Sequence, residues 1–116
     1  MTTVDSAGTP QPAPVWFLWR PDSTALLYSQ PTARKLARLA TNPAVTLHLN
    51  DDGEGHDFAV LTGVLTRGDE TRAAHEHPDY LAKYADLMAR VFGAPTGFST
   101  AFSVPLVFHP HKIRGI

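Results

Sequence analysis

Three basic residues lie close together in the first third of the chain and could bind a phosphate group. Arg34 and Lys35 are adjacent, and Arg38 lies one helical turn after Arg34 in a segment of strong helix formers. The start of a helix offers unpaired backbone N–H groups and a partial positive charge, and the hydroxyl groups of Ser29 and Thr32 would add donors. These residues predict an anion site, although cations on a short helix usually form only its solvated face.

An apolar and aromatic segment lies shortly before these cations and could cover a planar ring. It runs from Val15 through Trp16, Phe17 and Leu18 to Trp19. Aromatic side chains bury large flat surfaces, so these rings would serve either a bound ring system or the protein core. An aromatic strand beside a phosphate site predicts a ligand that carries both a ring and an anionic group.

The segments that must position these residues are short strands followed by a helix. Apolar residues and the intervening Pro-containing turn predict a hairpin of residues 15–19 and 24–29. The helix is expected over 32–40, with Ser29 or Gln30 as its cap. The end of the hairpin would therefore lie directly beside the start of the cationic helix.

The remaining segments predict a mainly β protein. Alternating apolar residues indicate strands at 44–50, 57–67 and 103–108, with a loop at 51–56, and helices are expected at 69–77 and 79–92. Asp79 is the predicted N-cap of the last helix, and Gly93 is its C′ residue. The apolar residues of this helix that are expected to face the core are Leu81, Tyr84, Met88 and Val91. Many strands with few helices predict a small β-barrel in one domain, residues 1–116.

Composition narrows the function classes. The chain has 116 residues and a formal net charge of −1, so there is no basic excess and we do not expect nucleic-acid binding. It has no cysteine, which excludes disulfides and thiolate metal sites and fits a reducing compartment. No apolar run approaches the roughly 20 residues that span a bilayer, and residues 1–14 lack the pattern of a signal peptide. We therefore expect a soluble cytoplasmic protein that does not bind membranes.

The sequence offers no clear acid–base or metal-binding constellation. Two His-x-His pairs, His75 with His77 and His109 with His111, lack a third ligand, and the neighbouring prolines indicate loops, so we predict no metal site. There is neither a nucleophile elbow nor a Gly-x-Gly-x-x-Gly loop. Catalytic side chains therefore stay unassigned, which is compatible with chemistry that a bound cofactor carries.

Four segments, in their order and spacing, resemble one protein family. They are Gly8–Trp19 (GTPQPAPVWFLW), Tyr28–Leu49 (YSQPTARKLARLATNPAVTLHL), Tyr80–Tyr84 (YLAKY) and Ser103–Gly115. Three of them resemble the strand pairs and the hairpin–helix junction of the pyridoxamine-5'-phosphate-oxidase-like split-barrel family. The YLAKY segment resembles the branch of that family that uses the deazaflavin coenzyme F420. The resemblance covers nearly the whole chain.

The resemblance implies a split β-barrel, mainly β with short helices, that forms a homodimer with cofactor sites at the subunit interface. It also implies an F420-dependent oxidoreductase that transfers hydride from the reduced deazaflavin to a small organic acceptor. The residues implied for the phosphate are Ser29, Arg34, Lys35 and Arg38. The residues implied for the ring are Pro14, Val15, Trp16 and Phe17. Among these, Lys35 is the strongest single candidate and Arg38 is a weaker one.

Two alternatives to an F420-dependent enzyme stay open. An FMN-binding enzyme of the same fold would need several cations at its phosphate, and this chain offers few locally. A non-catalytic module that binds the cofactor, or haem, would also lack acid–base residues. Relatives usually carry a helix before the first strand, whereas residues 1–4 are already expected to be that strand, so the contacts of such a helix are not expected here.

Overall fold

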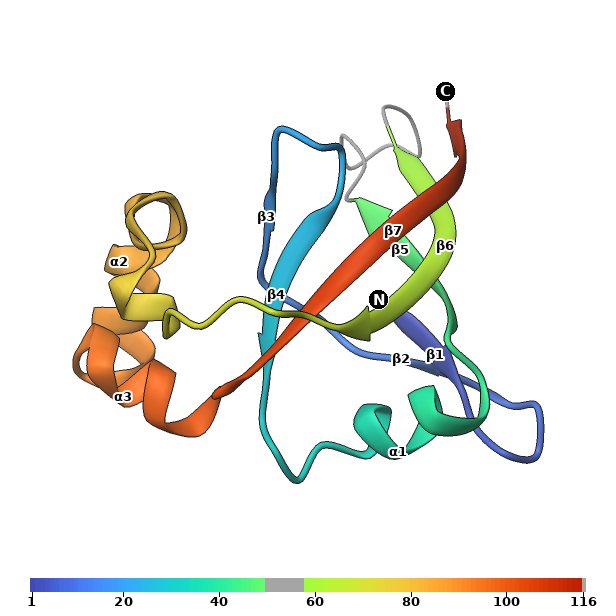
Figure 1. Ribbon diagram of the computed structural model, residues 1–116, viewed down its shortest axis with the longest axis horizontal. Helices are drawn as coiled ribbons and strands as arrows, with labels where there is room; N and C mark the ends of the chain where they lie inside the picture. Colours follow the sequence, from blue (N-terminus) through green and yellow to red (C-terminus); the bar gives the residue numbers. More distant parts are fainter. Residues whose placement is uncertain (50–57, 116) are drawn as a thin grey trace.

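The computed structural model describes residues 1–49 and 58–115, and the loop predicted over 51–56 lies outside them. The described residues form one antiparallel sheet of seven strands in the order β2-β1-β5-β6-β7-β4-β3, with short helices beside it (Figure 1). The strands are β1 (Thr2–Val4), β2 (Pro10–Pro12), β3 (Phe17–Trp19), β4 (Ala25–Ser29), β5 (Ala44–Leu49), β6 (Ala59–Arg67) and β7 (Val104–Gly115). The helices are α1 (Arg34–Thr41), the 3-10 helix η1 (Ala74–Glu76), α2 (Pro78–Phe92) and α3 (Pro95–Ala101). This architecture confirms the predicted mainly β fold with short helices.

The predicted hairpin is present as β3 and β4, with Phe17 opposite Leu27. The carboxylate of Asp22 holds the turn, because it accepts hydrogen bonds from the backbone N–H and the hydroxyl of Thr24 at 3.1 and 2.6 Å. Every residue of β4 is buried, since this strand lies between β3 and β7 and is covered on both faces. The hairpin therefore anchors the segment that precedes β3 to the middle of the protein.

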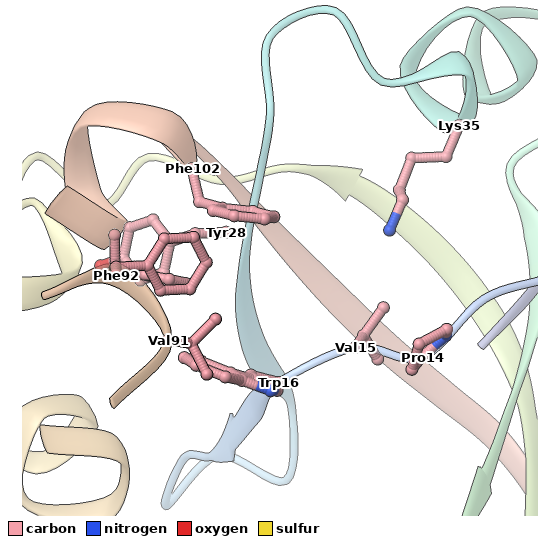
Figure 2. A pocket seen from close by; sticks show the side chains of 9 residues that line it. Pro14, Val15, Trp16, Tyr28, Lys35, Val91, Phe92 and Phe102 are labelled. Carbon is pink, nitrogen blue, oxygen red and sulfur yellow. The ribbon is translucent and has the colours of Figure 1, made fainter. Parts of the chain in front are cut away.

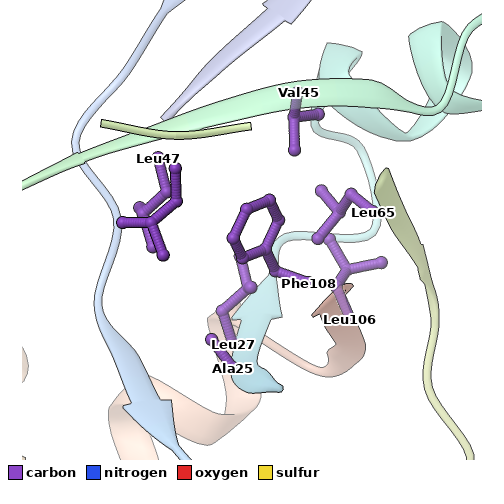
Figure 3. Packing of buried hydrophobic residues seen from close by; sticks show 8 residues of the cluster. Ala25, Leu27, Val45, Leu47, Leu65, Leu106 and Phe108 are labelled. Atoms are coloured by element: carbon purple, nitrogen blue, oxygen red, sulfur yellow. The ribbon is translucent and has the colours of Figure 1, made fainter. Parts of the chain in front are cut away.

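Two apolar clusters cover the two faces of β4. Its alternating residues Ala25 and Leu27 join the barrel core, whereas Leu26 and Tyr28 pack against the helices. The buried residues of the barrel core are Ala25, Leu27, Val45, Leu47, Leu61, Leu65, Leu106 and Phe108 (Figure 3). Burying a large apolar side chain contributes ~1.5–3 kcal/mol, so this core stabilises strands that are short individually.

β7 continues beyond the strand predicted over 103–108. The prediction of a loop around 109–111 is therefore wrong, because these residues belong to the strand. The register shifts between Thr62 and Gly63 of β6, close to Pro110, which has no N–H to donate. Gly63 permits a close approach there, because a Cβ atom on it would collide with the carbonyl oxygen of His109. The bulge therefore accommodates Pro110 within β7, and the strand continues to Gly115.

α1 begins later than predicted and has no side-chain cap. The predicted cap by Ser29 or Gln30 is wrong, because Ser29 belongs to β4 and the carbonyl of Gln30 accepts the N–H of Ala33 in a turn. Asn42 ends the helix as predicted. The strand and the helix are therefore separated by a short turn that begins at Gln30.

The C-terminal end of α2 confirms one prediction, whereas its N-terminal end and the segment before it correct two others. His77, not Asp79, caps the helix, since its Nδ1 accepts the N–H of Tyr80 at 3.3 Å. Gly93 ends the helix as predicted, with a φ of 76° that favours glycine. The helix expected over 69–77 is reduced to the single turn of η1.

No helix of the described residues is long and apolar enough to cross a membrane.

The buried face of α2 differs from the predicted stripe. Tyr80, Tyr84 and Met88 are buried, whereas Val91, which was expected to face the core, is 63% exposed. The sequence did not predict α3, whose Phe98 is buried against α2. Together, α2 and α3 form a helical layer that covers one face of β4 (Figure 1).

Candidate functional site

An apolar cavity of about 210 Å³ lies between the sheet and the helical layer (Figure 2). Its walls come from the segment before β3, from β4, α1 and the end of α2, and from α3 with the residue that follows it. The lining residues are Pro14, Val15, Trp16, Tyr28, Lys35, Val91, Phe92, Phe98 and Phe102. Segments far apart in the sequence therefore meet around one mostly aromatic space.

Trp16 forms one wall and is fixed by neighbouring rings. Its ring stacks with Tyr84 at 5.1 Å and with Phe98 at 5.0 Å between ring centres, with interplanar angles of 8° and 12°. Phe92 meets the Trp16 ring edge-on at 6.0 Å. Such aromatic pairs contribute about 0.5–1.5 kcal/mol beyond area burial. Trp16 therefore has a defined orientation before any ligand binds.

Three side chains of α2 hold the backbone beside Trp16. The hydroxyl of Tyr80 donates to the carbonyl of Trp16 at 3.1 Å, and that of Tyr84 accepts from the N–H of Phe17 and donates to its carbonyl, both at 2.8 Å. The ammonium of Lys83 donates to the same carbonyl at 2.6 Å and lies 4.3 Å from the centre of the Phe17 ring. The three positions share one helix face, and they occupy backbone groups of an edge strand that would otherwise be free.

Lys35 reaches the cavity from α1 and is the one charged side chain among the described residues that line it (Figure 2). The side chain is half-buried. Burial lowers the pKa of its ammonium group below the ordinary value, and the positive charge of Arg38 lowers it further. An anionic ligand group would oppose both effects, so Lys35 is the natural position for such a group.

Four of the sequence-predicted residues lie away from this cavity. Arg34 and Arg38 line a separate hollow beside β1 and β2, and Nη1 of Arg38 donates to the hydroxyl of Thr3 at 3.1 Å. Ser29 is buried in β4, and its hydroxyl donates to the carbonyl of the next residue at 3.0 Å. Phe17 packs against the barrel core. The predicted residues that the structure brings together are Pro14, Val15, Trp16 and Lys35.

The remaining lining residues were missed by the sequence analysis. They are Tyr28, Val91, Phe92, Phe98 and Phe102. A usable signal existed for Tyr28, because it directly precedes Ser29 on a strand whose alternate side chains face opposite sides. Phe98 lies in α3 and Phe102 directly follows it, and no sequence pattern indicated that helix, whereas Phe92 is the last residue of the predicted helix α2.

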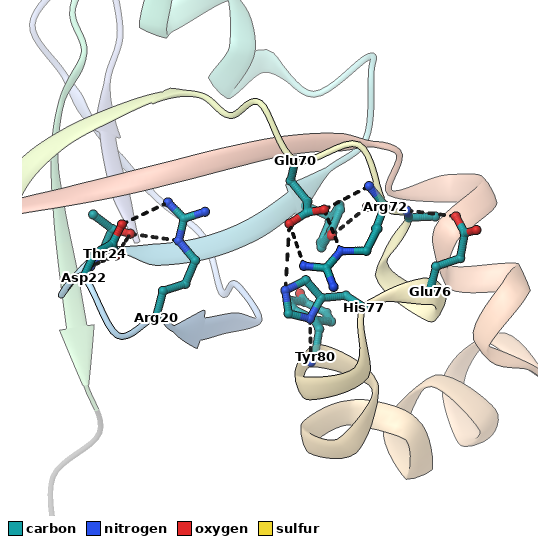
Figure 4. A network of polar contacts seen from close by, with 10 residues as sticks. Arg20, Asp22, Thr24, Glu70, Arg72, Glu76, His77 and Tyr80 are labelled. Carbon is teal, nitrogen blue, oxygen red and sulfur yellow. Dashed lines mark hydrogen bonds and ion pairs between the residues drawn. The ribbon is translucent and has the colours of Figure 1, made fainter.

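Tyr28 connects the back of the cavity to a charged pair. Its hydroxyl donates to the carbonyl of Arg72 at 2.9 Å, and burial raises its pKa to about 12, so it stays a neutral phenol. Nε and Nη2 of Arg72 donate to the two carboxylate oxygens of Glu70 at 2.9 and 3.1 Å (Figure 4). These bonds hold the pKa of Glu70 at about 2. The cavity wall is thereby tied to the segment that follows β6.

The cavity can bind a flat ring and one anionic group, but it offers little acid–base chemistry. Among the described lining residues there is no carboxylate and no imidazole. Within residues 1–49 and 58–115, no group of three or more His, Asp and Glu side chains could hold a metal ion. The donor set therefore fits a planar anionic cofactor, which would itself carry any redox chemistry.

Comparison with known proteins adds a family and several similar folds. The family model described as Pyridoxamine 5'-phosphate oxidase matches residues 1–113. A putative pyridoxamine 5'-phosphate oxidase from Listeria innocua has a TM-score of 0.68 and 20% identity, covering 99% of this chain and 84% of that one. An F420 reductase has a TM-score of 0.67 and 22% identity, covering 97% and 85%. HutZ, a heme storage protein from Vibrio cholerae, has a TM-score of 0.64 and 18% identity, covering 98% and 82%. No curated protein sequence matches the chain.

Proposed function

The chain belongs to the pyridoxamine 5'-phosphate oxidase family, and on this premise we propose that it is a coenzyme F420-dependent oxidoreductase. In this proposal it acts as a cytoplasmic homodimer and reduces a small organic acceptor. The observation that carries the proposal is the position of Lys35, a half-buried cation that faces an otherwise aromatic and apolar cavity. A flat ring with a phosphate-bearing side chain matches that arrangement.

The residues of the cavity would bind and orient the cofactor. When bound, the reduced deazaflavin would supply the hydride. Lys35 would pair with its phosphate, and Val15 and Trp16 would cover its ring and exclude water. Because Tyr84 and Phe98 already fix Trp16, binding would order few additional side chains. The neutral hydroxyl of Tyr28 would add polarity at the back of the cavity without adding charge.

The charge at the cavity favours F420 over the two alternatives. In this fold the FMN phosphate needs several cations, whereas the described lining residues provide Lys35 alone. Haem needs an axial ligand, and the described lining has no His or Met; Tyr28, with its raised pKa, is a poor tyrosinate ligand. One similar structure is an F420 reductase and another is a heme storage protein, so both ligands belong in the test.

A titration of one preparation with F420, FMN and hemin tests the proposal. We expect a colourless protein that shifts or quenches deazaflavin fluorescence and binds F420 more tightly than the other two. A protein that purifies yellow with FMN, or that prefers hemin, would contradict the cofactor assignment. Oxidation of reduced F420 across a panel of small acceptors then measures turnover. Tight F420 binding without any turnover would instead support a non-catalytic carrier.

Lys35→Ala is expected to weaken F420 binding at least severalfold and to leave thermal unfolding nearly unchanged. The lost charge-assisted contact is worth roughly 1.5–3 kcal/mol. Lys35→Arg keeps the charge, and Arg34→Ala removes a neighbouring cation that lines a different hollow, so both controls should stay closer to the wild-type affinity. Equal F420 affinity of the Lys35→Ala variant and the wild type would remove Lys35 from the phosphate site.

A further inference from the structure

A second hollow lies at the mouth of the barrel core, on the other face of β3 from the aromatic cavity. Trp16 and Leu18 pack against the helices, whereas Phe17 packs against the barrel core, with the ring of Trp19 5.5 Å from its own. The hollow measures about 540 Å³ and reaches Leu61 of the core. Small-molecule sites of ~300–1,000 Å³ are often found at barrel mouths.

The apolar wall of this hollow is exposed to solvent. Trp19 is 39% exposed and Ile113 is 68% exposed, so two large apolar side chains of the same hollow meet solvent together. Ile113 stands opposite Leu61 in the pairing of β6 with β7, so its side chain continues the face of the barrel core outward. Pro110 lines the same hollow. These residues offer a flat aromatic surface beside an aliphatic one.

The polar wall of the hollow is basic. Nε of Arg20 donates to the hydroxyl of Thr24 at 2.9 Å, and its Nη2 lies 3.7 Å from Asp22, so the guanidinium is held in place (Figure 4). Its remaining N–H donors make no further hydrogen bond within residues 1–49 and 58–115, and Asp22 offsets part of the charge. Lys112 and His111 also line the hollow, and among the described lining residues there is no carboxylate.

We infer that this hollow binds a small organic anion that joins a flat aromatic body to a carboxylate or similar group. The aromatic body would lie against Trp19 and Ile113, and the anionic group would meet Arg20 and Lys112. Fixed guanidinium groups favour such planar anions because they donate two parallel hydrogen bonds. The site is separate from the cofactor cavity, since the two lie on opposite faces of β3, and it does not depend on the proposed function.

A second copy of the chain is a poorer occupant of this hollow. In a two-fold symmetric contact centred here, Arg20, His111 and Lys112 of each copy would face the same basic residues of the other. Like charges brought together at an interface oppose association. An anionic ligand meets no such repulsion, so the charge of the hollow favours the ligand.

The chain has two tryptophans, one at each hollow, so their indole N–H signals in NMR spectra report on the two sites separately. We would titrate the ¹⁵N-labelled full chain with 2-naphthoate and with the neutral 2-naphthamide, assigning the signals with Trp19→Phe. Naphthoate is expected to shift the Trp19 signal and to leave that of Trp16 in place. Naphthamide is expected to bind about tenfold more weakly, because it lacks the charge.

Substitutions of the basic lining residues test where in the hollow the anionic group binds. Arg20→Gln and Lys112→Gln are each expected to weaken naphthoate binding severalfold to about tenfold. Arg90→Gln makes the same charge change on the exposed face of α2 and should have little effect. Equal binding of naphthamide, a shift of Trp16 alone, no shift of Trp19, or equal losses in the Arg90→Gln variant would each overturn the inference. A Trp19 signal that moves on dilution of the protein and not with naphthoate would assign the hollow to self-association.

Discussion

Glu70 shows how one charged residue stabilises the segment that follows β6. Its carboxylate accepts two hydrogen bonds from the guanidinium of Arg72 and one from the backbone N–H of Arg72, and these bonds hold its pKa at about 2 in place of the ordinary 4.5. A folded-state pKa below the unfolded value means that the ionised carboxylate stabilises the fold. This contribution is complete above pH 4.5 and is lost as the pH falls through about 2.

Glu70→Gln is therefore expected to lower the free energy of unfolding by on the order of 1 kcal/mol at neutral pH. The difference from wild type should shrink as the pH falls from 4.5 to about 2, because protonation neutralises the wild-type carboxylate over that range. Chemical denaturation of both proteins at several pH values measures this difference. Asp86→Asn, at an exposed carboxylate on α2, serves as the control. A difference that does not change with pH would contradict the role of the charge.

Lys35 and Trp16 could be predicted as site residues, because a cation after the hairpin and an aromatic residue before it are visible in the sequence. The orientation of the other cations was harder to foresee. Residues four apart share a helix face, so Arg34 and Arg38 point together, while Lys35 is turned by about 100° from Arg34. The helix therefore cannot present all three cations to one site. Which cation faces the cavity depends on how α1 packs on the sheet.

At the scale of elements, the contact between α2 and β3 shapes the aromatic cavity. Tyr84 both stacks on Trp16 and bonds to the N–H and the carbonyl of Phe17 through its hydroxyl. The helix therefore fixes the ring of the cavity wall and the backbone that carries it. The edge strand is too short to hold this geometry alone, since it has three residues.

Tyr84→Phe is expected to destabilise the protein by about 1–3 kcal/mol, because the partly buried N–H of Phe17 loses the Tyr84 hydroxyl and its carbonyl keeps Lys83 as a partner, while the stacked ring remains. F420 affinity should fall as well, because the Trp16 wall becomes less ordered. Urea unfolding and the cofactor titration measure the two effects. Leu87→Ala, at a half-buried position on the same helix, should lower stability without a matching loss of affinity. An unchanged affinity in the Tyr84→Phe variant would limit the role of this hydroxyl to stability.

The elements that the sequence predicted well are those with their own periodic pattern. The β3–β4 hairpin, β5, β6 and most of α2 have alternating or helical apolar spacing, and all are present. α3 could not be predicted in this way, because its residues Pro, Thr, Gly and Ser are poor helix formers and the burial of Phe98 holds it in place. Beyond the predicted strand end at 108, β7 continues through a bulge at His111, which no alternating pattern in β7 reveals.

At the scale of the whole molecule, the aromatic cavity is small and has an exposed apolar rim. It measures about 210 Å³, below the ~300–1,000 Å³ of ordinary small-molecule sites. Val91 lines it and is 63% exposed, so an apolar side chain stands at the rim facing solvent. A chain of this length buries only about two-thirds of its unfolded surface, so association would cover further apolar area. These features favour a second copy of the chain at the rim of the cavity.

We expect light scattering to give the mass of a dimer, and Val91→Glu to shift the protein toward monomer and to weaken F420 binding. The reason is that an unpaired carboxylate in a contact surface loses its hydration without gaining a partner. Ile113→Glu is the matched control, because Ile113 is as exposed, at 68%, but lies at the barrel mouth. Loss of the dimer in the Ile113→Glu variant alone would show that the dimer interface lies at that hollow and not at the rim of the cavity. A monomer at every concentration, with F420 still bound, would mean that one chain supplies the whole site.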